Sequence, residues 1–304
     1  SWVLTTLRRS ALLEWLSDHL LGPVGSALDR ALTRLFGQGA AEFSPSPSVT
    51  NSERRVSRGV ARIAVVLILG LVAAWGIVGA IGLLASVTPS EWGSVAIGAL
   101  ATFLRTTVTL VIGAAWTIPV GVWIGMNPKL AQRAQPVVQV VASIPATAVF
   151  PALLLVLLGL PGGLSVAAVA LMLLGTQWYI LFNVIAGAMA IPSDLREAAA
   201  VYKLSGWRRW RHLILPAIFP FLVTGMITAT GGAWNASIVA EYVTFHQQTF
   251  SIVGLGSLIA SAADAANFSL LLAGTLTMAA VVVAVNRLFW RRLYVIAEQR
   301  YRLE

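Results

Sequence analysis

One uncharged stretch decides the fold: Leu164-Ser-Val-Ala-Ala-Val-Ala-Leu-Met-Leu-Leu-Gly-Thr-Gln-Trp-Tyr-Ile-Leu-Phe-Asn-Val-Ile-Ala-Gly-Ala-Met-Ala190. A helix of about 20 apolar residues crosses a hydrocarbon core roughly 30 Å thick, so this stretch is long enough to span a membrane. Other segments have the same character, and we place them at 61–86, 105–126, 137–158, 213–240 and 267–289. The sequence therefore predicts an all-α integral membrane protein with about six transmembrane helices in a domain covering residues 60–290.

The composition supports a membrane protein and argues against several other classes. Of the 304 residues, 58% are hydrophobic and 11% are charged, whereas soluble domains carry about 25% charged residues. Cysteine is absent, and the histidines lie far apart at His19, His212 and His246. We therefore expect no metal site, no cofactor in this chain and no catalytic residues, which weakens the alternative of a membrane-embedded enzyme.

The distribution of charge predicts the topology. If the N-terminus is cytoplasmic, every Lys and Arg of the 21 falls in an inner segment except Arg105, which we place at the start of the second span. The outer loops then carry the acids Glu91, Glu241 and Asp264. This pattern follows the positive-inside rule and predicts a multi-pass protein of the bacterial inner membrane with both termini in the cytoplasm. The net charge of +9 is explained by topology, so we expect no nucleic-acid binding.

The two ends of the chain differ from its apolar middle. Residues 1–59 contain apolar positions at helical spacing around Gly22-Pro23, followed by a Ser- and Pro-rich linker at 44–52. The helices are predicted either to lie on the membrane lipid surface or to pack on a cytosolic domain. Residues 291–304 are predicted to form a cytoplasmic tail.

The longest inner loop, 191–212, has the pattern of a helix, a turn and a second helix. Ser193 or Asp194 is suited to cap the first helix, and the three alanines at 198–200 favour helix. Ser205-Gly206 permits a sharp turn, after which a second, basic helix is expected over 207–211. From the residues alone, this loop is either a docking element or an ordinary structured connection.

The same loop resembles a known family. Glu197-Ala198-Ala199 followed by Leu215-Pro216 is similar to the EAA loop of binding-protein-dependent ABC importer permeases, and the resemblance covers roughly 90–290. It implies a type I importer architecture in which a coupling helix contacts a separate ATPase. The family usually has Gly where this chain has Lys203, which leaves the geometry of the turn open. The coupling residues that the resemblance implies are Glu197, Ala198, Ala199, Lys203, Gly206, Trp207, Arg208 and Pro216.

A narrower resemblance concerns the substrate. The stretches 175–183 and 231–242 are similar to the nitrate, sulfonate and bicarbonate branch, in which some members fuse two permease halves. This implies transport of a small anion delivered by a periplasmic binding protein. It also implies a second permease half, which is fused, homologous or identical to this one; the chain itself is then a candidate for the C-terminal half of a tandem permease. No G-x-x-x-x-G-K-[ST] motif is present, so ATP and Mg would be bound by a partner ATPase dimer.

Polar residues inside apolar spans are candidates for lining a pathway, because they tend to face cavities or the bundle interior. These are Gln177, Asn183 and Asn235. Arg105 is expected either to attract an entering anion or to extend toward the membrane interface. Glu241 is expected to pair with a basic group or to contact a binding protein. An ion-gradient-driven secondary transporter remains the alternative function, although it usually needs ionisable residues at mid-membrane, and a channel would leave the EAA loop unexplained.

Small residues recur every four positions in two of the predicted spans. Such stripes indicate close helix contacts more readily than gating surfaces. Prolines are expected to kink their helices. The stripes are Gly113, Thr117, Gly121 and Gly125, then Thr224, Thr228, Gly232 and Ala236; the prolines are Pro119, Pro145 and Pro151.

Overall fold

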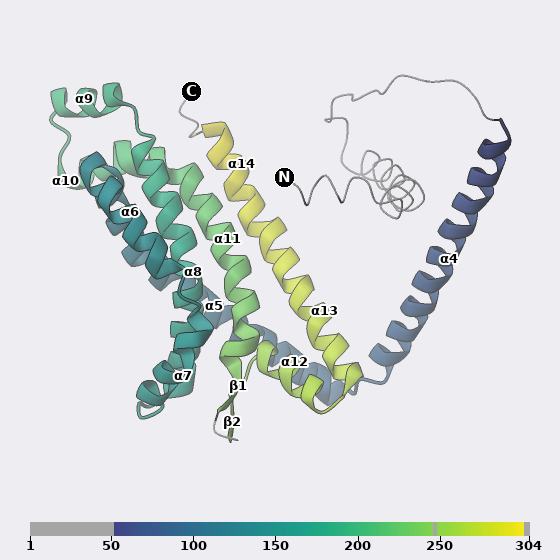
Figure 1. Ribbon diagram of the computed structural model, residues 1–304. Coiled ribbons are helices and arrows are strands. Elements are labelled where there is room, and N and C mark those ends of the chain that lie inside the picture. The colour runs from purple at the N-terminus through teal and green to yellow at the C-terminus, as the bar shows by residue number, and fades with distance from the viewer. Residues whose placement is uncertain (1–51, 246–247, 301–304) are drawn as a thin grey trace, which may run out of the picture. The chain divides into compact units, whose positions relative to one another are not determined.

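The computed structural model describes residues 52–245 and 248–300, with side chains placed from 67 to 299 within those ranges. The predicted amphipathic helices and linker of residues 1–51 lie outside the described residues. The helices of the described residues, shown in Figure 1, are α4 (Ser52–Ala85), α5 (Pro89–Gly125), α6 (Pro128–Ala142), α7 (Ala146–Leu157), α8 (Gly163–Met189), α9 (Ser193–Val201), α10 (Gly206–Arg209), α11 (Leu215–Glu241), α12 (Leu255–Asp264), α13 (Phe268–Val285) and α14 (Arg291–Arg300). Two π-helical turns, η2 (Trp210–Ile214) and η3 (Asn286–Trp290), and two strands, β1 (Tyr242–Phe245) and β2 (Gln248–Ser251), complete the described elements.

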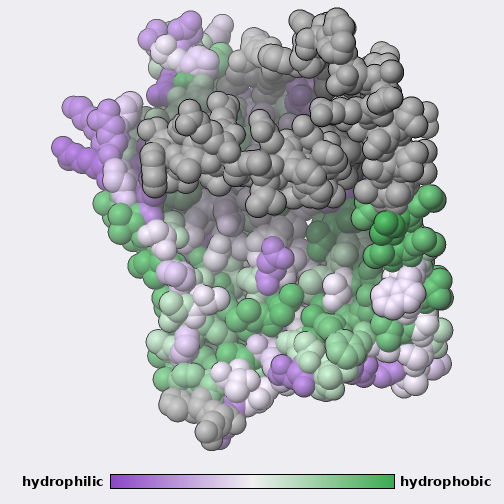
Figure 2. All heavy atoms as spheres, turned by 45° about the vertical axis from the view of Figure 1, so that its right-hand side comes forward, coloured by the Kyte–Doolittle hydropathy of each residue, from purple (hydrophilic) through white to green (hydrophobic). Residues whose placement is uncertain are grey.

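The membrane-protein prediction is confirmed. Among the described residues, five helices are long and apolar enough to cross a membrane, and a bent pair of helices makes a sixth span if it is counted as one. Large apolar side chains remain exposed on these helices, for example Trp75 at 81% and Val156 at 76%. Figure 2 shows hydrophobic residues across the middle of the visible face, with hydrophilic ones at its lower edge and upper left. Lipid is the solvent that such a surface requires.

The chain divides into two compact units, Ser1–Gly79 and Ala80–Glu304. The described part of the first unit is helix α4 as far as Gly79, and the end of that helix belongs to the second unit. The apolar segment of α4 runs over Leu67–Ala85. The second unit contains every element from α5 onward and carries the site described below.

Three long helices form the core of the second unit, with α8 packed against both α5 and α11. The stripe of small residues on α5 makes this contact possible: a Cβ added at Gly121 would lie 2.8 Å from Val184, and one at Gly125 would lie 2.6 Å from the carbonyl oxygen of Ile185. The contact interpretation of that stripe is therefore confirmed. On α11 the stripe divides, since Gly232 packs on Thr176 whereas Thr224 and Thr228 are exposed.

The second span is longer than its apolar pattern suggested. Helix α5 begins at Pro89, where Thr88 and Glu91 form a capping box, so Arg105 lies well inside the helix and not at its start. The span was predicted to begin at Arg105 because that residue is charged. In the structure Arg105 lies within the helix, and an ion pair with Glu241 neutralises its charge. The acid Glu91, expected in a loop, belongs to the first helical turn.

The third span is broken. Helices α6 and α7 meet at an angle of 75° across Ser143–Pro145, so the predicted span over 137–158 consists of two helices with a bend between them. Pro145 is the N-cap of α7, where its missing N–H is not needed, and it confirms one of the three proline expectations. Pro119 and Pro151 lie inside α5 and α7.

Two further elements were not predicted, and both follow α11. Strands β1 and β2 pair antiparallel, with Val243 opposite Phe250, and the short helix α12 comes next. The hydroxyl of Tyr242 donates a 2.8 Å hydrogen bond to Asp264 at the end of α12, and this bond raises the pKa of the tyrosine. In Figure 1 the hairpin and α12 lie at one end of the second unit and α9 lies at the other; we call these the hairpin end and the α9 end.

Candidate functional site: the α9 loop, a polar helix face and a buried ion pair

Helix α9 lies in the loop predicted to form a docking element. It begins at Ser193, its N-cap is Pro192, and no side chain caps it, so the prediction that Ser193 or Asp194 is the cap is wrong. The Ser193 hydroxyl instead bonds to the Asp194 carboxylate at 3.2 Å. Asp194 still stands in the first turn, where the helix dipole favours an acid.

The C-terminus of α9 shows how the chain turns at Lys203, where the family usually has glycine. Lys203 takes a left-handed conformation with φ of 49°, the conformation that glycine adopts most easily. The N–H of Leu204 donates to the carbonyl of Ala199 at 2.8 Å, and that of Lys203 donates to Ala200 at 3.0 Å. These two bonds are the Schellman motif that ends many helices. The turn therefore begins at Lys203, and Gly206, also at positive φ, opens the following helix.

One face of α9 is packed against the bundle. Ala199 is 5% exposed and forms a small apolar cluster with Ile191, Leu204, Leu213 and Ala217. Three large side chains of the loop are exposed instead: Val201, Tyr202 and Trp207 are 79%, 77% and 70% exposed. Helical spacing places Glu197 and Val201 opposite Ala199. The loop thus presents an acid and several apolar side chains to a partner.

Arg196 fastens α9 to the end of α8. Its Nε donates to the carbonyl of Ile191 at 3.0 Å, and its guanidinium also lies 3.4 Å from the carbonyls of Ala188 and Met189. These are carbonyls at the C-terminus of α8, which lack helical partners and attract a cation. This role of Arg196 was not predicted from the sequence, in which the residue contributed only to the basic charge of the inner segments.

The second helix of the predicted helix–turn–helix is not separate. Helix α10, η2 and α11 join into one 36-residue helical segment, Gly206–Glu241, with Pro216 in the first turn of α11. The π-helical turn η2 joins the basic helix α10 to the apolar helix α11. As a result, the α9 loop is connected directly to the helix that crosses the bundle.

Two of the predicted pathway residues lie on neighbouring helices, with Asn235 exposed on α11 and Asn183 half-buried on α8. Thr224, Thr228 and Asn235 are exposed on α11, and their spacing places them within about 40° of one another around the helix. Tyr179 and Asn183 occupy a similar stripe on α8, and Gly225 brings the two helices together, since its Cβ would lie 2.9 Å from that of Asn183. The pair α8–α11 therefore presents one polar, uncharged face.

The other two predicted pathway residues lie elsewhere. Gln177 is buried and accepts a 3.1 Å hydrogen bond from the indole of Trp116 on α5. Arg105 forms an ion pair with Glu241, and its second terminal nitrogen donates to the carbonyl of Val253 at 3.0 Å. The expectation that Glu241 pairs with a basic group is confirmed.

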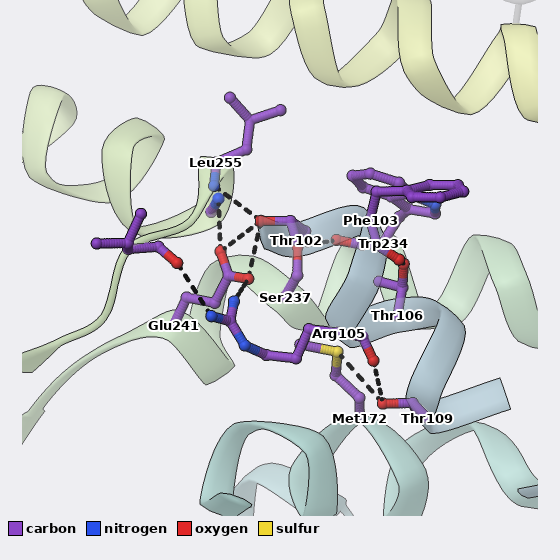
Figure 3. Close-up of polar contacts among 12 residues, drawn as sticks. Thr102, Phe103, Arg105, Thr106, Thr109, Met172, Trp234, Ser237, Glu241 and Leu255 are labelled. Atoms are coloured by element: carbon purple, nitrogen blue, oxygen red, sulfur yellow. Dashed lines mark hydrogen bonds and ion pairs between the residues drawn. The ribbon is translucent and has the colours of Figure 1, made fainter. Parts of the chain in front are cut away.

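Glu241 is the centre of a buried cluster at the hairpin end (Figure 3). Its side chain is fully buried, and its carboxylate accepts hydrogen bonds from the Thr102 hydroxyl at 2.8 Å and from the N–H of Gly256 at 2.9 Å. The Thr102 oxygen in turn accepts a 2.8 Å bond from the N–H of Leu255. A basic partner was one of two expectations for Glu241, but Arg105 was not predicted to be that partner. Thr102 was missed as well, because a threonine in an apolar helix gives no distinguishing signal.

Comparison with known proteins identifies the family. Residues 117–303 match the model of the family described as binding-protein-dependent transport system inner membrane component. The chain belongs to this family. The α9 loop, the α8–α11 face and Glu241 lie within the matched region, whereas Thr102 and Arg105, which bind Glu241, precede it.

The chain is similar in sequence to permeases of several named transport systems. It is 30% identical over 144 residues to the nitrate import permease protein NrtB of Leptolyngbya laminosa, covering 47% of this chain and 50% of that one. It is 31% identical over 161 residues to the bicarbonate transport system permease protein CmpB of Synechococcus elongatus, covering 53% and 54%. It is 25% identical over 177 residues to the putative aliphatic sulfonates transport permease protein SsuC of Bacillus subtilis, covering 58% and 60%. The chain spans about half the length of the first two of these relatives.

Proposed function

We propose that this chain is the permease subunit of an ATP-driven importer, located in a bacterial inner membrane, with the α9 end in the cytoplasm. Family membership supports the importer, and the charge distribution supports the orientation. Basic residues gather in the loops and helices of the α9 end, whereas Asp264 lies at the hairpin end. A cytoplasmic α9 end agrees with the positive-inside rule.

The observation that carries the proposal is the α9 loop. It is anchored on one side by Ala199 and Leu204, and it leaves Val201, Tyr202 and Trp207 exposed on the other. Exposed apolar side chains of this size mark a docking surface when they lie outside the membrane. A dimer of cytoplasmic ATPases, which binds ATP and Mg, is the partner that the family implies. The sequence of this chain contains no phosphate-binding loop of its own.

The α8–α11 face supports the choice of an anion as the transported solute. Within α8 and α11, the single acidic residue is Glu241, and Arg105 neutralises it. The polar groups of the face that could donate to a solute are the exposed Tyr179 hydroxyl and Asn235 amide and the half-buried Asn183 amide, one of whose two N–H groups donates to the Tyr179 carbonyl. Such groups donate hydrogen bonds to an anion without adding a repelling charge. The relatives named as nitrate import and bicarbonate transport permeases agree with this assignment. In the proposed importer, a periplasmic binding protein delivers the anion.

A second permease half would cover this face. It is fused, homologous or identical to this chain, and the pathway would run between the two halves. An ion-gradient-driven transporter is not favoured, because α8 and α11 offer no unpaired ionisable group to carry a coupling ion.

Charge reversal in α9 tests the proposal. Glu197→Arg is expected to abolish copurification of the ATPase from membranes in which the unmodified chain retains it. Lys129→Glu, a charge reversal in the exposed first turn of α6, is the matched control and should retain the ATPase. An unmodified chain that never copurifies with an ATPase, or that imports anions into vesicles without ATP, would refute the importer assignment.

A further inference from the structure

The helical segment formed by α10, η2 and α11 connects the two ends of the second unit. The helical segment Gly206–Glu241 has 36 residues and, at 1.5 Å per residue, is about 54 Å long. It begins at the turn that follows α9 and ends at Glu241, the residue at the centre of the buried cluster in Figure 3. A movement of the α9 loop along the axis of this segment would therefore also move Glu241.

Glu241 caps the next helix. The carboxylate accepts the N–H of Gly256, and the Thr102 hydroxyl, which donates to the same carboxylate, accepts the N–H of Leu255. Both N–H groups belong to the first turn of α12, where no helical partner exists for them and where a negative charge is favourable. The first turn of α12 is thus held by two side chains, one from α11 and one from α5.

Glycines allow this contact. A Cβ at Gly254 would lie 2.1 Å from the Glu241 carboxylate, and one at Gly256 would lie 2.6 Å from the carbonyl of Ser237 on α11. A Cβ at Gly98 on α5 would lie 3.1 Å from the backbone of Gly254. The backbone of α12 therefore rests directly on α5 and α11, with no side chain between them that would absorb a shift.

Arg105 completes the arrangement. Its guanidinium pairs with Glu241 and also donates to the carbonyl of Val253, one residue before the α12 N-cap. Arg105 on α5 supplies the positive charge that balances the buried carboxylate. The same side chain also holds the segment that leads into α12. A buried carboxylate with several partners is costly to disturb singly, so the group tends to move as one body.

We propose that Glu241, Thr102 and Arg105 are positioning residues that make α12 follow the movements of α11, so that a change at the α9 loop is relayed to the surface of the hairpin end. The proposal rests on the proposed importer function, in which the α9 loop is moved by the ATPase. The relay is a helix cap in addition to an ion pair. Exchanging the two charges, as in Arg105→Glu with Glu241→Arg, therefore does not restore it, because an arginine cannot accept the N–H of Gly256.

Single cysteines provide the measurement, since the chain contains none. Ser257→Cys places a reporter on the half-buried first turn of α12, and Ser261→Cys places a matched one a turn later, where the helix is exposed. Each is labelled with a membrane-impermeant maleimide from the side of the hairpin end. The chain is kept in its native membrane together with the ATPase that copurifies with it, either without nucleotide or trapped with ATP and vanadate.

With Glu241 present, the labelling rate at position 257 is expected to change by about fivefold or more between the two nucleotide states, the lower range of measured couplings between sites. In Glu241→Gln, Thr102→Val and the charge exchange, the ratio falls to about one, while the rate at position 261 stays constant. Asp264→Asn, a charge neutralisation at the other end of α12, keeps the full response. Retained ATPase copurification shows that each variant is folded.

The outcomes separate the relay from the importer assignment. A nucleotide response at position 257 that persists in folded Glu241→Gln overturns the relay and leaves the proposed function standing. Full recovery in the charge exchange also overturns it, because the ion pair alone would then suffice. A chain without an ATPase partner overturns both proposals.

Discussion

Replacing Gly225 by alanine tests the packing of α8 against α11, on which the polar face depends. A Cβ at this position would lie 2.9 Å from the Cβ of Asn183, 2.9 Å from the carbonyl oxygen of Tyr179 and 3.1 Å from the Cα of Ile180. Two of these neighbours are backbone atoms, which cannot rotate away. Overpacking of this kind costs about 1–3 kcal/mol.

Gly231 on the same helix is the matched control, since a Cβ there meets nothing within 4 Å. Alanine is favoured over glycine in a helix by about 1 kcal/mol at either position. The difference in free energy of unfolding between Gly231→Ala and Gly225→Ala removes this common gain and leaves the overpacking cost of about 1–3 kcal/mol.

The assay is unfolding in detergent micelles, followed by the fluorescence of the 11 tryptophans. We expect Gly231→Ala to match or exceed the stability of the unmodified chain, and Gly225→Ala to unfold earlier. Equal stability of the two variants would refute the close contact between α8 and α11.

Three further changes are expected to have local effects. Lys203→Gly should relieve the left-handed strain at the end of α9 by about 1 kcal/mol and slow amide exchange of Leu204 several-fold, whereas Lys203→Ala, which keeps the strain, should not; equal exchange in both would contradict the Schellman geometry. Arg196→Gln should reduce ATP-driven uptake while the ATPase still copurifies, because α9 loses its attachment to α8; normal uptake would remove that role from Arg196. Asn235→Leu should impair uptake without altering ATPase copurification, and unchanged uptake would exclude Asn235 from the pathway.

Much of the fold could be predicted because length and apolarity alone mark a membrane span. The segment 164–190 agrees with α8 to within one residue, since no charge or proline interrupts it. The span at 105–126 was placed too short because Arg105 was read as a boundary. The charge is accommodated inside the helix by Glu241, a residue 136 positions away, and single-sequence patterns do not report such pairs.

The candidate site was predictable where it is local and unpredictable where it depends on tertiary contacts. The loop with α9 follows from its motif, and the replacement of glycine by Lys203 left only the turn geometry open. By contrast, Gln177 and Asn235 look alike in sequence as polar residues within spans. Packing decides between them, since Gln177 bonds to Trp116 inside the bundle and Asn235 is exposed. The hairpin and α12 were missed because they are shorter than the apolar length that marks a span.

Photo-crosslinking at Tyr202 tests the central claim, that the loop of α9 docks an ATPase. A photoreactive amino acid replaces Tyr202, which is 77% exposed at the end of α9, and Tyr179, which is 43% exposed on the α8 face, serves as the control. We predict that position 202 captures a nucleotide-binding ATPase subunit in native membranes and that position 179 captures none. Capture of lipid alone at position 202, or of the ATPase at both positions, would contradict the account.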